Sequence, residues 1–214
     1  MNQIAEARKQ NRSALDEQAG KALLAAYGVA VPLSVVVAGA DEVGQKLKSL
    51  KFPVVVKVMS PDILHKSDAG GVRINLRTPE EVAEAVRAMM QQPAIAGACI
   101  DGFLVEEMAP AGQEMVIGGL RDPQFGPLVM VGLGGIFVEV LADVSFRICP
   151  ITRLDAQEML AELKGAAILK GARGSKPVSQ EAIIDVLLKV GGENGLLMAH
   201  ADDIKEADIN PLIV

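Results

Sequence analysis

A lysine stands inside the apolar run FPVVVKV at residues 52–58, whose valines are typical of a buried strand. An unpaired ammonium group is costly to bury, so Lys57 either reaches solvent from the end of the strand or meets a fixed anion. A phosphate group is an anion that suits this place. Lys57 is therefore a candidate phosphate-binding residue, and a merely solvated lysine remains the alternative at this point.

The loop that follows this strand, SPDILHKSDAGG at residues 60–71, carries the first of the two histidines in the chain. The neutral ring nitrogen of a histidine is a nucleophile near pH 7, and a carboxylate such as Asp62 or Asp68 would orient the ring. Because this loop leaves a possible phosphate-binding strand, His65 is a candidate for a role in chemistry. A loop histidine that only donates a hydrogen bond fits the same pattern.

Two further stretches offer oxygen-bearing side chains. Glu106 and Glu107 end an expected strand in VEEMAPAGQE, and Glu114 follows a bend rich in Pro and Gly. In EADINPLIV, Asp208 and Asn210 alternate along an expected strand, so they should share one face and offer two oxygen ligands to Mg²⁺. Taken singly, each pattern fits an ordinary solvent-facing surface equally well.

The glycines of MVGLGGIFVE, residues 130–139, do not form a dinucleotide-binding fingerprint. Phe137 stands where the third glycine should be, and the flanking strands read as antiparallel. A tight bend, or a close approach of the backbone to an anion, explains these glycines better. A dinucleotide-dependent oxidoreductase is therefore disfavoured.

The composition narrows the class of protein. The chain has 214 residues, half of them apolar, which is enough for one large domain or two lobes. A net charge of −6 and few aromatic residues disfavour a nucleic-acid partner. Cys99 and Cys149 lie in apolar settings and are predicted to be ordinary core thiols of a cytoplasmic protein. No stretch reaches the length of about 18 apolar residues that would span a membrane.

The elements that must position these residues form an α+β pattern in two lobes, 1–108 and 109–214, with a ligand expected at their junction. In the first lobe we expect a helix capped at Ser13, strands at 32–37, 52–59, 71–76 and 102–108, and helices at 41–50 and after Thr78. In the second lobe we expect a hairpin around RDPQFG, strands at 136–141 and 144–150, helices capped by Thr152 and Ser179, and a terminal strand.

Read together, four stretches resemble the ATP-grasp module of ADP-forming acyl-CoA synthetases: AYGVAVP, FPVVVKVMSPDILHKSDAGGV, FLVEEMAPAGQEMVIGGLRDPQFGPLVMVGLGGIFVEVL and DINPLIV. The resemblance is to the β subunit of ADP-forming acetate–CoA ligase and, more distantly, to that of succinyl-CoA synthetase. It runs in order from about residue 13 to the end of the chain. It implies an ATP-grasp fold, in which two α+β lobes clamp a nucleotide.

The resemblance also implies roles for the residues above. Lys57 would contact the phosphates of ATP or ADP, Glu114 would take the ribose hydroxyls, and Asn210, with Asp208, would hold Mg²⁺. The strand end that would hold the adenine edge is Glu106, Glu107 and Met108. Family members usually continue into a further strand with another metal-binding aspartate, whereas this sequence ends at Val214, so either the sequence stops short of that strand or the metal site is incomplete.

In this family the reaction passes through a phosphohistidine on a CoA-binding α subunit, and His65 matches a second histidine that is implicated as a phosphate carrier. The implied activity interconverts ATP, a carboxylate and CoA with ADP, phosphate and acyl-CoA, in a hetero-oligomer of the cytoplasm. Which carboxylic acid reacts stays open. The alternative function is a non-catalytic nucleotide-binding module within a larger acyl-CoA or acetyltransferase assembly.

Overall fold

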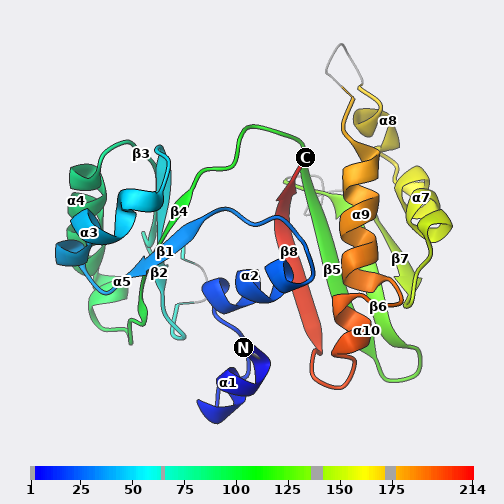
Figure 1. Ribbon diagram of the computed structural model, residues 1–214, viewed down its shortest axis with the longest axis horizontal. Coiled ribbons are helices and arrows are strands. Elements are labelled where there is room, and N and C mark those ends of the chain that lie inside the picture. Colours follow the sequence, from blue (N-terminus) through cyan, green and yellow to red (C-terminus); the bar gives the residue numbers. More distant parts are fainter. Residues whose placement is uncertain (1–2, 64–65, 136–141, 172–176) are drawn as a thin grey trace. The chain divides into compact units, whose positions relative to one another are not determined.

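The computed structural model describes residues 3–63, 66–135, 142–171 and 177–214 (Figure 1). By its contacts the chain divides into two compact units. Unit 1 comprises Met1–Leu23 and Ala30–Ala109, and unit 2 comprises Leu24–Val29 and Pro110–Val214. Within the described residues, each unit contains a four-stranded antiparallel sheet with helices, which confirms the α+β class. None of the helices in these ranges combines the length and the apolar character needed to cross a bilayer.

The sheet of unit 1 has the strand order β1-β4-β2-β3. Every neighbouring pair in it is antiparallel. Its strands are β1 (Ser34–Val37), β2 (Val54–Met59), β3 (Val72–Leu76) and β4 (Gly102–Glu107). The two inner strands are the most buried, and each carries apolar side chains in succession, VVV in β2 and FLV in β4.

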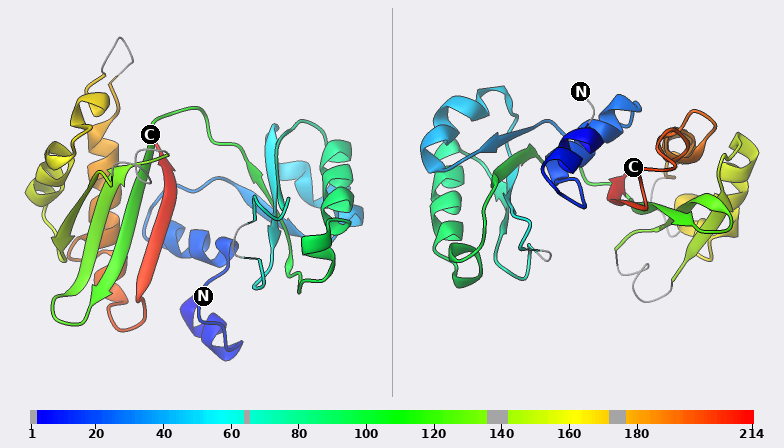
Figure 2. Two further views of the ribbon diagram at one scale, coloured as in Figure 1. Left: turned by 180° about the vertical axis from the view of Figure 1, so that it is seen from behind. Right: turned by 90° about the horizontal axis from the view of Figure 1, so that it is seen from below.

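Side-chain alternation divides the inner strands of unit 1 between two faces. Val54, Val56 and Val58 of β2 point into the core, where they meet Phe103 and Val105 of β4. The residues between them, which include Lys57 and Glu106, therefore point to the opposite face. The core side is covered by α4 and α3, as the turned views show (Figure 2).

The helices of unit 1 are mostly short. They are α1 (Gln3–Lys9), α2 (Glu17–Ala26, whose last three residues belong to unit 2), η1 (Ala40–Glu42), α3 (Val43–Lys46), η2 (Leu47–Ser49), α4 (Pro79–Met90) and α5 (Pro93–Ala96). Thr78 caps α4 by accepting from the backbone of Glu81, as predicted. The predicted cap at Ser13 is wrong, because α2 begins at Glu17 and the carboxylate of Asp16 accepts the backbone N–H of Ala19. The helix expected at 41–50 is three short helical segments in succession.

The sheet of unit 2 has the strand order β7-β6-β5-β8, again antiparallel. Its strands are β5 (Glu114–Asp122), β6 (Gly126–Leu133), β7 (Val144–Ile148) and β8 (Glu206–Ile213). The predicted hairpin is β5–β6, with Asp122 accepting two backbone N–H groups of the turn. The strand predicted at 136–141 lies outside the described residues.

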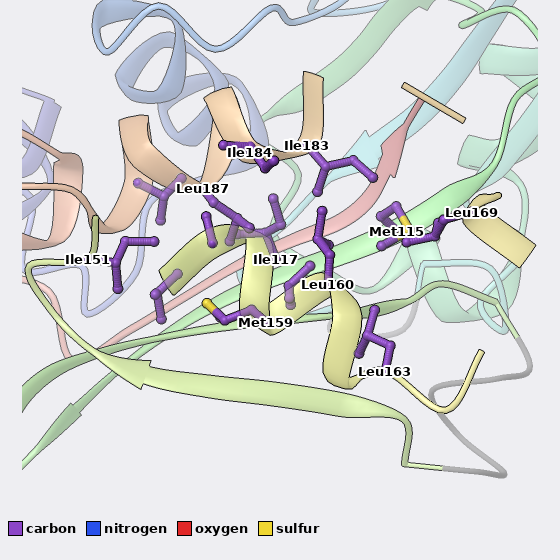
Figure 3. Close-up of a cluster of buried hydrophobic side chains, with 14 of the residues drawn as sticks. Met115, Ile117, Ile151, Met159, Leu160, Leu163, Leu169, Ile183, Ile184 and Leu187 are labelled. Carbon is purple, nitrogen blue, oxygen red and sulfur yellow. The ribbon is translucent and has the colours of Figure 1, made fainter. Parts of the chain in front are cut away.

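One face of this sheet is covered by helices. They are α7 (Arg153–Glu162), α8 (Ala166–Leu169), α9 (Gln180–Gly191) and α10 (Leu196–Ala199). Thr152 forms a capping box with Asp155, and Ser179 caps α9, as predicted. Side chains of α7 and α9 point at β5 and bury a cluster that includes Met115, Ile117, Met159 and Leu187 (Figure 3). This core fixes the sheet on which Glu114, Asp208 and Asn210 lie.

The two cysteines differ in their surroundings. Cys149 is buried, and burial raises the pKa of its thiol to about 11, as expected for a core residue. Cys99 is exposed, so the prediction that it is a core thiol is wrong. The residues around Cys99 divide between the core and the surface, because Ile95 on α5 is buried while Cys99, in the irregular segment after α5, is exposed.

Candidate functional site

Lys57 does not reach freely into solvent. It lies on β2 between Val56 and Val58, which are fully buried, and 24% of its side chain is exposed. Its Nζ donates to Glu17 Oε1 at 2.6 Å and to Glu106 Oε1 at 3.3 Å. The strand therefore tolerates this lysine because two carboxylates meet its ammonium group.

Lys57 is part of a larger set of charges on this face of unit 1, which we call the charge cluster. Its members are Glu17, Lys21, Lys57, Lys66 and Glu106. Lys66 Nζ lies 2.7 Å from Glu17 Oε2, and Lys21 pairs with both Glu17, at 3.0 Å, and Glu106. Three ammonium groups face two carboxylates, so the cluster carries one positive charge in excess when all five groups are ionised.

The contacts within the cluster favour the ionised forms of Glu17 and Lys57. Burial acts to raise the pKa of Glu17, but the hydrogen bonds from Lys57 and Lys66 outweigh it and lower this pKa from 4.5 to about 2. Burial acts to lower the pKa of Lys57, while the hydrogen bond to Glu17 and the charge of Glu106 raise it above its usual 10.5. An excess of positive charge on a partly buried face is a suitable receptor for a polyphosphate.

The loop between β2 and β3 is held on both sides of residues 64–65. Before them, Asp62 Oδ2 accepts the backbone N–H of Cys99 at 2.7 Å. After them, the carbonyl of Lys66 accepts the N–H of Gly71 at 2.7 Å, while its ammonium group binds Glu17. His65 itself lies outside the described residues. Because its carboxylate is already engaged by Cys99, Asp62 is a poorer candidate than Asp68 for orienting a histidine ring.

Two glycines close this loop for different reasons. Gly70 has φ +72°, a backbone conformation that favours glycine, and a Cβ there would meet only Gln92 at an ordinary distance of 3.5 Å. Gly71 has no such backbone, but a Cβ there would lie 2.4 Å from Cγ1 of Val58. The closing turn therefore requires glycine at residue 71 for lack of space.

The end of β4 holds the residues predicted for the adenine edge. The side chain of Glu106 is only 6% exposed and is engaged by Lys57 and Lys21. Glu107 Oε1 accepts the backbone N–H of Lys51 at 2.7 Å, and Met108 donates its N–H to Pro53. These contacts fix the end of the strand. The carboxylates of Glu106 and Glu107 both have partners within unit 1.

Glu114 is the first residue of β5, and its side chain is exposed. Its carbonyl accepts the N–H of Gly134 at 2.8 Å, and a Cβ at Gly134 would lie 2.7 Å from the carbonyl carbon of Glu114. Gly135 has φ +65°, and its ideal Cβ position is 3.4 Å from Glu114 Oε2. Glu114 therefore packs against Gly134 and Gly135. Gly134 has no space for a side chain, because its backbone lies directly against the backbone of Glu114.

Asp208 and Asn210 both lie on the edge strand β8, and both are exposed. Partial burial, followed by the charge of Glu206, raises the pKa of Asp208 above its usual 3.8. The pairing of β8 with β5 is regular from Glu206 to Ile209 and shifts before Leu212, so Asn210 stands at the irregularity. The simple alternation assumed from the sequence therefore ends at Asn210.

No group of three or more His, Cys, Asp or Glu side chains that could hold a metal occurs within the described ranges. A cation at Asp208 and Asn210 would therefore take one carboxylate and one amide oxygen from the described chain. The remaining ligands would be phosphate oxygens or water, as is usual for Mg²⁺ beside a nucleotide. This donor set, of oxygen atoms alone, fits a hard cation.

The comparison with family models matches residues 6–214 to the ATP-grasp domain. The chain belongs to the ATP-grasp family. It is 47% identical over 211 residues to the β subunit of ADP-forming acetate–CoA ligase I of Pyrococcus furiosus, covering 98% of this chain and 89% of that subunit. The family predicted from the sequence, an ADP-forming acyl-CoA synthetase β subunit with an ATP-grasp fold, is confirmed by these matches.

The solved structures agree with this assignment. The acetyl-coenzyme A synthetase 1 of Ca. Korarchaeum cryptofilum, in complex with coenzyme A and Ca-AMPCP, has a TM-score of 0.91 and 42% identity, covering 98% of this chain and 91% of that chain. A second structure of that protein holds coenzyme A and Mg-AMPPCP, with a phosphohistidine segment pointing towards the nucleotide-binding site. It has a TM-score of 0.84 and 41% identity, covering 98% of this chain and 90% of that chain.

Sequence reasoning about this ATP-grasp chain missed Glu17, Lys21 and Lys66 as site residues. Glu17 and Lys21 are four residues apart on α2, a spacing that also occurs on exposed helix surfaces and so carried no signal of its own. Lys66 stands beside His65 in the loop, and that adjacency was the one available signal. Glu17 meets Lys57 and Lys66, and Lys21 meets Glu106, only through the tertiary packing of unit 1.

Proposed function

We propose that this chain is the ATP-binding subunit of an ADP-forming acyl-CoA synthetase. It interconverts ATP, a carboxylate and CoA with ADP, phosphate and acyl-CoA, through a phosphohistidine. The observation that carries the proposal is Lys57, held on β2 of an ATP-grasp chain within a cluster of excess positive charge. A phosphate chain is the ligand that such a cluster suits.

In this proposal Lys57 binds the nucleotide phosphates, and Glu114 accepts hydrogen bonds from the ribose hydroxyls. The exposed carboxylate of Glu114 at the start of β5 supports that role. The adenine edge meets the strand end formed by Glu106, Glu107 and Met108. Because the carboxylates of Glu106 and Glu107 and the backbone N–H of Met108 are engaged, the base would meet the remaining groups of this segment.

Asp208 and Asn210 hold Mg²⁺, which would neutralise charge on the phosphates when it is bound. The oxygen-only donor set and the raised pKa of Asp208 support this role, since a nearby cation would favour the ionised carboxylate. On the chain's own side, Asp208 supplies the charge and Asn210 a neutral oxygen.

The partner in this proposal is an α subunit that binds CoA and carries the phosphohistidine. Support comes from the match to a β subunit, a name that implies an α partner. His65 would act as a second phosphoryl carrier between the nucleotide and that histidine. The hetero-oligomer would work in the cytoplasm.

The experiment that tests the proposal is incubation with γ-labelled ATP and Mg²⁺, with and without a CoA-binding α subunit of this enzyme family. We expect an acid-labile label on protein and, with CoA and a carboxylate, formation of acyl-CoA and ADP. ATP binding without label transfer or turnover in the presence of the α subunit would favour a non-catalytic nucleotide-binding module instead. Failure to bind ATP would exclude both functions.

A further inference from the structure

The two carboxylates of the charge cluster differ in how firmly they are held. Glu106 lies on the inner strand β4 with 6% of its side chain exposed, so it is a fixed part of the sheet. Glu17 lies in the first turn of α2 with 21% of its side chain exposed. Of the two, Glu17 is the carboxylate that another anion can reach.

Glu17 uses both carboxylate oxygens on the ammonium groups that matter for phosphate. Its Oε1 is 2.6 Å from Lys57 and its Oε2 is 2.7 Å from Lys66. If Glu17 withdrew, Lys57 would retain Glu106, whereas Lys66 would keep no other acidic partner within the described part of the chain. Removal of this one carboxylate therefore frees Lys66 from its acidic partner in the described chain and leaves Lys57 with only the longer contact of 3.3 Å to Glu106.

We propose that Glu17 competes with the nucleotide polyphosphate for Lys57 and Lys66. When the nucleotide binds, phosphate oxygens replace the Glu17 carboxylate on the two ammonium groups. When the nucleotide leaves, Glu17 takes both lysines back. The inference rests on the proposed function, because it names the polyphosphate of ATP or ADP as the competing anion.

The exchange is one anion for another and needs no proton transfer. The pKa of Glu17, lowered to about 2, keeps the carboxylate ionised at any physiological pH. A polyphosphate carries more charge than a carboxylate and offers several oxygens, so it wins when present. Because Glu17 lowers the cost of leaving the lysines without a ligand, it makes the nucleotide easier to release.

The test compares ADP binding to three forms of the whole chain: wild type, Glu17→Gln and Glu42→Gln. Glu42 is the matched control, because its carboxylate pairs with Lys46 at 2.8 Å in the same unit but outside the charge cluster. Calorimetry gives the dissociation constants for Mg-ADP, and stopped-flow displacement of a fluorescent ADP gives the release rates. Circular dichroism reports whether each variant is folded.

We expect Glu17→Gln to bind ADP roughly tenfold more tightly than wild type, mostly through slower release, since it removes one charged competitor. Glu42→Gln should match wild type within about twofold, because exposed charges at a distance are screened. If Glu17→Gln does not fold, Glu17→Asp keeps the charge but shortens the side chain by one methylene, and it should tighten ADP binding by a smaller factor.

Unchanged or weaker ADP binding by folded Glu17→Gln and Glu17→Asp, in a chain whose wild type binds ADP, would overturn the competition and leave the proposed function intact. It would mean that Glu17 only supports the structure of the cluster. If the wild type binds neither ADP nor ATP, the competition and the proposed function fall together. The two failures are therefore distinguishable.

Discussion

Glu17 Oε1 and Lys57 Nζ lie 2.6 Å apart, although 40 positions separate the two residues in the sequence. The contact joins the first turn of α2 to an inner strand of the sheet of unit 1. Both side chains are mostly shielded, so solvent and salt screen the attraction between them less than in an exposed ion pair. It joins α2 to Lys57, the residue proposed to bind the phosphates.

Replacing Lys57 by alanine should weaken ATP binding by at least about tenfold, because it removes the central ammonium group of the cluster. The fold should survive, since Glu106 keeps Lys21 as a partner. Calorimetry with Mg-ATP measures the affinity, and Lys46→Ala, which removes a lysine from an exposed pair, is the control. Unchanged affinity in a folded Lys57→Ala variant would remove this residue from the nucleotide site.

The depressed pKa of Glu17 predicts a dependence of stability on acid pH. The pKa of Glu17 in the folded chain is about 2, below its ordinary 4.5. Its ionised form therefore contributes stability that is fully present above pH 4.5 and is lost as the pH falls from 4.5 towards 2.

Carboxyl-carbon NMR of the labelled chain should give a Glu17 midpoint near 2, and Glu17→Gln should lose less unfolding free energy than wild type across that pH range. A midpoint close to 4.5 would show that the pairs with Lys57 and Lys66 do not form in solution.

The proposed metal residues predict a change in magnesium dependence. Asp208→Asn should raise the Mg²⁺ concentration needed for half-maximal nucleotide binding by about tenfold, which is about 1.4 kcal/mol, because a neutral amide replaces the only carboxylate of the pair. Asn210→Ala should act in the same direction. Glu206→Gln removes the same charge from the same strand and serves as the control. If Asp208→Asn and Glu206→Gln raised the required Mg²⁺ concentration equally, the effect would come from the loss of one negative charge and not from a metal ligand at Asp208.

The carrier role of His65 predicts a covalent label. With γ-labelled ATP, the bond between the γ-phosphorus and the bridging oxygen of ADP would break as a nitrogen–phosphorus bond forms on the ring. Phosphopeptide mapping under alkaline conditions should then place label on residue 65. His65→Gln should abolish acyl-CoA-dependent ATP formation while ADP still binds.

The second histidine of the chain provides the control for this experiment. His200 lies in unit 2 beside Asp203, so His200→Gln should keep both label and turnover. Full turnover in His65→Gln would exclude the carrier role, because glutamine can donate a hydrogen bond but cannot carry a phosphoryl group.

The sequence predicted local features well and the partners of those features poorly. The valine run around Lys57 predicted a buried strand, since a repeated branched side chain is a strong local signal. The partners of Lys57 were not predicted, because Glu17 and Glu106 are 40 and 49 positions away and meet it only through sheet pairing and helix packing. A solvated lysine and a paired one look the same in a sequence.

Competing local signals explain the remaining errors. Ser13 and Asp16 both suit a helix cap, and the fold uses the one nearer the apolar stripe of α2. The alternation of Asp208 and Asn210 was read correctly as a strand, but the register shift beside Asn210 depends on the facing strand β5. The register between two strands depends on both of them, so it cannot be predicted from the sequence of β8 alone.

Gly70 and Gly71, at the end of the β2–β3 loop, should tolerate different substitutions. At residue 70 the constraint is the backbone, so asparagine, which tolerates φ near +72°, is an acceptable replacement and alanine a poor one. At residue 71 the constraint is steric, because any Cβ would collide with the buried side chain of Val58. Every residue other than glycine should therefore destabilise the loop. Selection for folded variants from a library that randomises both positions should therefore return glycine or asparagine at residue 70 and glycine alone at residue 71.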